Sequence, residues 1–110
     1  MKKTTLGIAG NDPFVVLKDA NLEEAIQAAA IGRLRNNGQN CFAPRRIIVI
    51  DEHYDMFKEQ LIEILKKVKY GDPMDPNTEM GPLKESNHLS LEEHMKSLPT
   101  SWRVIWEREI

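Results

Sequence analysis

A single cysteine is the side chain in this sequence best suited to covalent chemistry. Cys41 is the only cysteine among the 110 residues, and it follows the polar residues 36–40, Asn-Asn-Gly-Gln-Asn. A cysteine thiolate is a strong nucleophile, and backbone amides beside it stabilise the oxyanion that forms when it attacks a carbonyl carbon. A lone cysteine is also commonly a small, inert residue of the core. The spacing alone does not distinguish a nucleophilic cysteine from an inert one.

Histidines and arginines are the other candidates for a site. Of the three histidines, His88 and His94 are six residues apart and would not share a helical face, and His53 is distant. We therefore predict surface histidines and no metal site. Arg45 and Arg46 could hold a substrate carboxylate, because a guanidinium binds a carboxylate through two parallel hydrogen bonds. The alternative is that they are solvated charges at the entrance of a strand.

Two apolar segments and the helix between them must position Cys41. Residues 14–17 and 45–50 are rich in β-branched residues and predict two strands that are apolar on both faces. Between them, Asn21 followed by Glu24 predicts a helix cap, and the helix is expected to end at Gly38. A strand, helix, strand order favours a right-handed parallel crossover, with Cys41 in the connection that enters the second strand.

The second half of the chain predicts two further helices. From Asp55 one apolar stripe recurs at helical spacing, with lysines near the end of the helix and Gly71 beyond it. Residues 71–76 contain two prolines and predict a loop. A third helix is expected from Ser90 to just before Pro99. Residues 102–106, which include both tryptophans, predict a last strand or an apolar tail with a core or interface role.

Two strands with apolar faces on both sides need more cover than three helices provide, so we predict self-association. If the tail at residues 102–106 folds back as a third strand, a monomer suffices. The net charge of -2 gives no electrostatic reason to expect nucleic acid or an anionic membrane as a partner. The apolar runs are too short to cross a bilayer, and one unpaired cysteine suits a reducing cytoplasm.

Four short motifs occur in order along the chain: residues 10–17 (Gly-Asn-Asp-Pro-Phe-Val-Val-Leu), 38–41 (Gly-Gln-Asn-Cys), 71–73 (Gly-Asp-Pro) and 80–83 (Met-Gly-Pro-Leu). In this order and spacing they resemble the aldehyde dehydrogenase superfamily over residues 6–83, most closely its succinate-semialdehyde branch. The resemblance implies an α/β fold, part of the catalytic domain, with βαβα order and a small, mainly parallel sheet. Residues 1–84 would be the catalytic-domain fragment, and residues 85–110 a divergent segment packed on the same domain.

The resemblance also implies a reaction. Cys41 would attack an aldehyde carbon, the thiohemiacetal would pass hydride to NAD or NADP, and water would hydrolyse the thioester to an acid. The backbone amide of Cys41 would form part of the oxyanion site. Gly7 stands where the family has its general-base glutamate, and no glycine-rich phosphate loop occurs. We therefore expect no cofactor to bind this chain alone, little activity without a complementary dehydrogenase chain, and, as the alternative, a non-catalytic remnant or association module.

Overall fold

The computed structural model describes residues 2–5, 7, 10–83 and 85–98. The chain divides into two compact units, Met1–Lys69 and Tyr70–Ile110, which we describe separately. In the first unit the order is β1 (Pro13–Val16), α1 (Leu22–Leu34), a short 3-10 helix η1 (Arg35–Gly38), β2 (Arg46–Val49) and α2 (Asp51–Lys67). The second unit contains α3 (Glu85–Lys96). The predicted division at residue 84 lies inside the second unit and stays a prediction.

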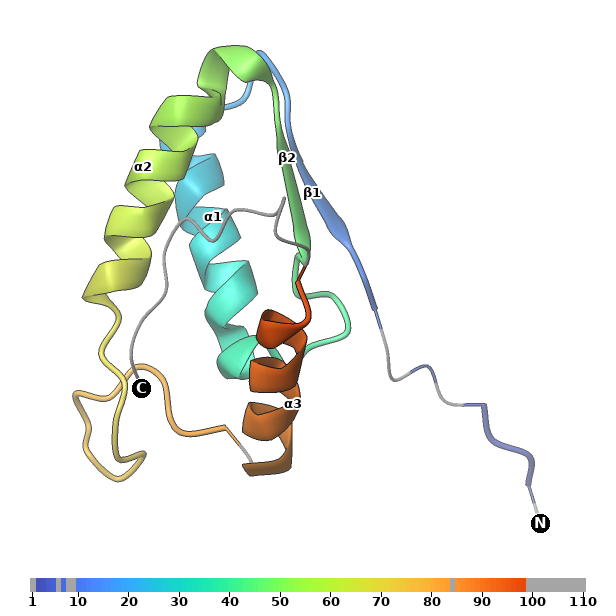
Figure 1. Cartoon of the computed structure of the whole chain (residues 1–110). Coiled ribbons are helices and arrows are strands. Elements are labelled where there is room, and N and C mark those ends of the chain that lie inside the picture. The colour runs from blue at the N-terminus through green and yellow to red at the C-terminus, as the bar shows by residue number, and fades with distance from the viewer. Residues whose placement is uncertain (1, 6, 8–9, 84, 99–110) are drawn as a thin grey trace. The chain divides into compact units, whose positions relative to one another are not determined.

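Strands β1 and β2 form a parallel sheet in which Phe14 pairs with Ile47, and Val16 pairs with Val49. The α/β class, the βαβα order and the small parallel sheet are confirmed. Both helices of this unit pack on the same side of the sheet (Figure 1). Side chains alternate along a strand, so one face of the sheet meets the helices and the other faces away from them.

The core lies between the sheet and the two helices. Its buried members come from all three elements: Val16 of β1, Ile26 and Ala29 of α1, and Phe57 of α2. Phe14, Ile47 and Val49 of the sheet pack around this cluster, with five further side chains from the helices and the connection before α1: Ala20, Leu22, Ala25, Leu61 and Ile64. The apolar stripe predicted from Asp55 is the face that α2 presents to this core.

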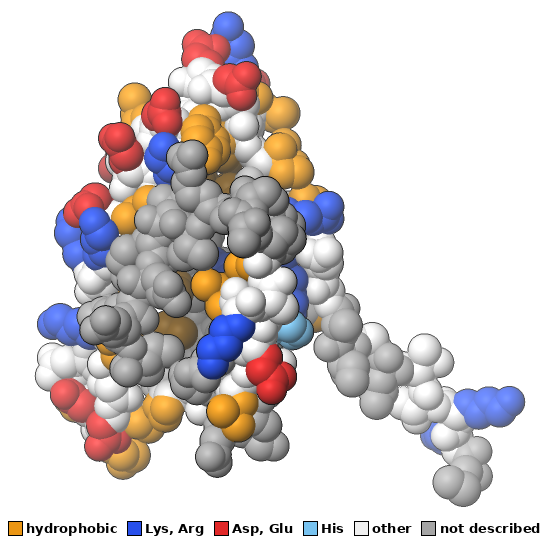
Figure 2. Space-filling view, viewed as in Figure 1, with side chains coloured by type: hydrophobic (Ala, Val, Ile, Leu, Met, Phe, Trp, Pro, Cys, Tyr) orange, Lys and Arg blue, Asp and Glu red, His pale blue; other side chains and the backbone are white. Residues whose placement is uncertain are grey.

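The face of the sheet that points away from the helices is exposed. The sequence predicts that apolar residues on both faces need cover, and for this face that stays a prediction. Val15 and Ile48, which are partners in the sheet, are 54% and 51% exposed in the described structure. Hydrophobic side chains are visible along the strands at the right of Figure 2. The residues proposed to provide a third strand, 102–106, lie outside those that the structure describes.

The ends of the helices follow local chemistry, with shifts from the predicted positions. Asn21 caps α1 as predicted, its side-chain oxygen accepting a hydrogen bond from the Glu24 amide at 3.4 Å. Helix α1 ends at Leu34, four residues before the predicted end at Gly38, because Arg35 leaves the helical region at φ −53° and ψ 127°. Helix α2 begins at Asp51 rather than at the predicted Asp55. The carboxylates of Asp51 and Glu52 in its first turn favour this earlier start.

In the second unit a loop connects two short segments before the last helix. Tyr70 and Met80 form a parallel bridge, and the Gly71 amide donates to the Met80 carbonyl at 3.1 Å. Within the predicted loop, the carboxylates of Asp72 and Asp75 accept hydrogen bonds from amides two residues ahead. Such turns satisfy backbone donors where proline prevents regular structure.

The last helix starts earlier than predicted. Helix α3 begins at Glu85, five residues before the expected start at Ser90, and ends at Lys96. No glycine or proline interrupts residues 85–96, so nothing in the sequence prevents a helix from beginning there. Among the described residues, no helix is long and apolar enough to span a membrane.

Candidate active site around Cys41

A left-handed turn leads the chain from α1 to Cys41. Asn36, Asn37 and Gly38 have φ angles of 53°, 55° and 73°. Glycine adopts this region freely, and asparagine tolerates it better than most residues. The Asn40 side chain donates to the Arg35 carbonyl at 2.9 Å, which closes the turn. The polar residues before the cysteine therefore serve first to reverse the chain.

Cys41 itself lies in a turn on the surface. Cys41 is free and exposed, so it does not lie in the core, and whether its thiol is reactive or inert is not decided by this position. The Ala43 amide donates to the Asn40 carbonyl at 3.3 Å, and Ala43 is fully buried. The buried Ala43 thus fixes the turn to the interior of the protein, while Cys41 remains accessible. The role of Cys41 as a nucleophile stays a prediction.

The backbone of Cys41 is placed by the segment before β1. Gly10 lies so close to the Cys41 carbonyl that a Cβ atom at position 10 would overlap it. Next to this contact, the Arg45 amide donates to the Asp12 carbonyl at 3.1 Å and the Arg46 guanidinium donates to the Asn11 carbonyl at 2.9 Å. Within the part of the chain that the structure describes, no hydrogen bond engages the backbone amide of Cys41. That the amide forms part of an oxyanion site stays a prediction.

The two arginines after the cysteine separate in the fold. Arg46 is held by its hydrogen bond to the Asn11 carbonyl and ties the two strand entrances together. Arg45 instead lines a cavity together with Arg33, a residue that the sequence did not single out. Arg33 stands on the last turn of α1. Arg33 lies beside Arg45 because of the crossover connection between α1 and β2. No local sequence motif therefore indicates that Arg33 lines this cavity.

The remaining candidates show no site. The His53 ring nitrogen lies 3.0 Å from the Lys18 carbonyl, and the His94 side chain is exposed. The side chain of His88 is not described. Among the described residues, no three histidine, cysteine or carboxylate side chains lie together in a group that could hold a metal ion. Gly7, which the sequence resemblance aligns with the family's general-base glutamate, is exposed, and a Cβ atom added to it would meet nothing within 4 Å.

Two hollows of the first unit are lined by described residues, and neither suits a nicotinamide dinucleotide. A cavity of about 300 Å³, lined in part by Arg33 and Arg45, is at the lower limit for a drug-sized ligand. A wider groove of about 670 Å³ between α1 and α2 is lined by three glutamates, which would repel a pyrophosphate: Glu23, Glu59 and Glu63. These two hollows therefore do not fit the cofactor.

A parallel strand, helix, strand unit with an exposed cysteine on the polar turn between its helix and its second strand defines an α/β module with a thiol site. The family model for the aldehyde dehydrogenase family matches residues 1–98. The chain belongs to the aldehyde dehydrogenase family.

The chain is similar to succinate-semialdehyde dehydrogenases of several mycobacteria. The chain is 46% identical over 83 residues to the NADP(+) succinate-semialdehyde dehydrogenase of Mycobacterium avium (strain 104), covering 76% of this chain and 18% of the relative. It is 38% identical over 106 residues to that of Mycobacterium leprae (strain TN), covering 96% of this chain and 23% of the relative. The chain thus spans about a fifth of the length of these relatives.

Solved structures share the fold. An NAD+ complex of aldehyde dehydrogenase from Bacillus cereus superposes with a TM-score of 0.77 and 37% identity, covering 80% of this chain and 18% of that one. The succinate-semialdehyde dehydrogenase from Burkholderia pseudomallei gives a TM-score of 0.75 and 35% identity over the same shares. The resemblance stated from the sequence motifs is confirmed.

Proposed function

We propose that this chain carries the nucleophilic cysteine of a succinate-semialdehyde-type aldehyde dehydrogenase and depends on further polypeptide for turnover. The observation that carries the proposal is the exposed thiol of Cys41 on a turn whose backbone amide has no partner among the described residues. The names of the relatives support an aldehyde with a carboxylate as substrate. A cytoplasmic location suits a reactive thiol that must stay reduced.

The chemistry assigned to this chain is addition of the thiol to an aldehyde. The Cys41 sulfur forms a bond to the carbonyl carbon, the carbonyl π pair moves to the oxygen, and the proton of the thiol ends on that oxygen. The product is a thiohemiacetal. While the oxygen carries negative charge, a hydrogen bond from the Cys41 amide stabilises it. Addition is reversible and needs no oxidant.

Oxidation of the adduct would require the rest of a dehydrogenase. A bound nicotinamide dinucleotide supplies hydride acceptance in proteins such as the NAD+ complex from Bacillus cereus. In this chain the described hollows do not fit such a group, and Gly7 offers no carboxylate to activate water. Loss of a positioned base typically costs about 10²–10⁴ in rate. Our proposal for the chain alone therefore ends at the addition step.

Acylation by an activated ester tests the thiol directly. We expect p-nitrophenyl acetate to release a burst of one nitrophenolate per chain, and Cys41→Ala to abolish it. Because Cys41 is exposed, this substitution should leave the urea midpoint unchanged. Glutathione at the same concentration is the reference thiol. A burst no faster than the reaction of glutathione would favour the non-catalytic remnant.

Cofactor reduction tests the dependence on further polypeptide. The chain is mixed with succinate semialdehyde and NADP or NAD, and absorbance of the reduced cofactor is followed. We expect no turnover by the chain alone. Turnover that Cys41→Ala abolishes would show that the chain is sufficient and would contradict this part of the proposal.

Self-association is the second candidate, favoured by the uncovered sheet face. Val15 and Ile48 present adjoining apolar surface, and in the described residues each strand has only one neighbour. A second copy could cover this face, and the small net charge of -2 opposes that only weakly. A complementary dehydrogenase chain is the alternative occupant.

Light scattering distinguishes these outcomes. We expect an assembly larger than a monomer at high concentration, which Ile48→Glu should dissociate. Met74→Glu is the matched control, because Met74 is 86% exposed and lies in a loop of the second unit. A monomer at high concentration would contradict self-association and leave a complementary chain as the occupant to test.

A further inference from the structure

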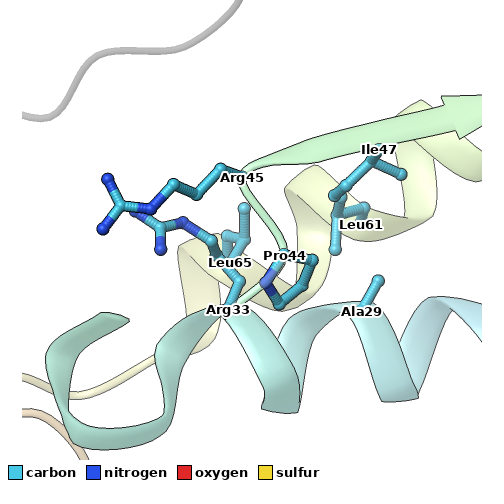
Figure 3. Close-up of a pocket in the computed structure, with 7 residues that line it drawn as sticks. All are labelled: Ala29, Arg33, Pro44, Arg45, Ile47, Leu61 and Leu65. Atoms are coloured by element: carbon cyan, nitrogen blue, oxygen red, sulfur yellow. The ribbon is translucent and has the colours of Figure 1, made fainter. Parts of the chain in front are cut away.

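A cavity with one cationic end opens between α1, α2 and the start of β2. It measures about 300 Å³ and is lined by seven residues from these elements: Ala29, Arg33, Pro44, Arg45, Ile47, Leu61 and Leu65. Figure 3 shows the two arginine side chains extending to one end of it, while Ala29, Ile47 and Leu61 gather at the other. The cavity is therefore amphipathic along its length.

The apolar end is part of the folded core. Ala29 is fully buried, and Ile47 and Leu61 pack partly buried against the same cluster. Every lining residue other than the two arginines is hydrophobic or proline. A ligand group that enters this end must be aliphatic, because a polar group there would lose its hydrogen bonds to water without replacement.

The cationic end lacks a counter-charge. Within the described residues, neither Arg33 nor Arg45 forms an ion pair with a carboxylate. Arg33 donates one hydrogen bond, to the Gly38 carbonyl at 3.4 Å, which leaves most of the donors of its guanidinium unused. Two like charges at one opening repel each other, and an anion between them would relieve that repulsion. A carboxylate suits a guanidinium because it accepts two parallel hydrogen bonds.

We propose that this cavity binds a short aliphatic monocarboxylate. The carboxylate lies between Arg33 and Arg45, and the alkyl chain extends toward Ala29, Ile47 and Leu61. A second carboxylate at the far end would meet no donor among the lining residues, so a dicarboxylate binds less well. Cys41 does not line this cavity, and the inference does not depend on the activity proposed for that residue.

Titration of the ¹⁵N-labelled chain with carboxylates of graded length tests the proposal. We expect amide shifts at residues of the cavity and a dissociation constant for hexanoate roughly sixteenfold below that for butyrate, because each of the two additional buried methylenes adds roughly fourfold. Adipate and 1-hexanol should bind more weakly than hexanoate. Inorganic phosphate binding as tightly as hexanoate would overturn the aliphatic part of the proposal, and so would butyrate equal to hexanoate.

Charge removal tests the head group. Arg33→Gln and Arg45→Gln should each weaken hexanoate about tenfold, the usual effect of losing a hydrogen bond to a charged group. Arg45→Gln is the cleaner variant, because no hydrogen bond of its side chain holds the described fold. Lys67→Gln removes one charge from α2 outside the cavity and should bind hexanoate like the unaltered chain. Unchanged affinity in both arginine variants, with circular dichroism showing that they fold, would overturn the proposal.

Discussion

Gly10 and Cys41 are in backbone contact, although 31 positions separate them in the sequence. A Cβ atom at position 10 would overlap the Cys41 carbonyl oxygen and would lie 2.6 Å from the carbonyl carbon. Only a residue without a side chain fits this approach. The segment that enters β1 thus packs directly against the turn that carries Cys41. The contact joins the motif at residues 10–17 to the motif at residues 38–41.

Gly10→Ala should disturb that turn. The Cys41 backbone must move to accommodate the methyl group, and overpacking of this kind costs about 1–3 kcal/mol. We expect a lower urea midpoint and an altered rate of Cys41 alkylation. Gly7→Ala is the control, since an added methyl group there meets nothing within 4 Å. If the two variants behave alike, the contact does not position the cysteine.

Gly32 in α1 and Gly38 in η1 should respond to alanine in opposite directions. Gly38 has a φ of 73°, so Gly38→Ala forces a side chain into the left-handed region and should cost about 1–2 kcal/mol. Gly32 is helical, and its added Cβ would lie an ordinary 3.4 Å from the Pro44 ring. Gly32→Ala should therefore stabilise the chain by about 0.5–1 kcal/mol. Urea unfolding measures both, and a destabilised Gly32→Ala would refute the packing assigned to Pro44.

Phe57 should contribute most to the stability of the first unit. It is 2% exposed and joins α2 to residues of both α1 and β1. Phe57→Ala removes a buried ring and should cost about 3–5 kcal/mol in the free energy of unfolding. Phe42→Ala, at a position that is 55% exposed, should change it by less than about 0.5 kcal/mol. Similar losses in the free energy of unfolding for the two variants would mean that Phe57 is not a central residue of the core.

Asp75 should titrate below the ordinary range of an aspartate. The backbone amide of Asn77 lowers the pKa of this carboxyl most, and the Asn77 side chain lowers it further, because both donate to the charged form. The folded pKa is the lower one, so the stabilisation is present above the unfolded pKa and is lost as pH falls through the folded pKa. In Asn77→Ala the pKa of Asp75 should rise only part of the way to the ordinary value of an aspartate, because the backbone amide at position 77 still donates. A carboxyl ¹³C titration checks this, and an unchanged pKa would mean that the side chain does not donate.

Local sequence patterns predicted the order of the elements and the cap on α1. The strand signals at residues 14–17 and 45–50 and the Asn21 cap depend on neighbouring residues, so they can be found without knowledge of the fold. The end of α1 was placed at Gly38 because glycine commonly follows a helix. The structure ends the helix at Leu34, because Arg35 leaves the helical region and Asn36 and Asn37 then adopt the left-handed conformation. Asparagine permits that conformation without requiring it, so the sequence alone did not determine where α1 ends.

The residue types and their order determined the family, the parallel unit and the cysteine as the reactive candidate. Only the tertiary structure decided that the Cys41 thiol is exposed, that Gly10 touches its backbone and that Arg33 shares a cavity with Arg45. The physical reason is that these relationships join segments far apart in the chain. Their distances depend on how the helices pack on the sheet, and no periodicity or spacing within one segment records that packing.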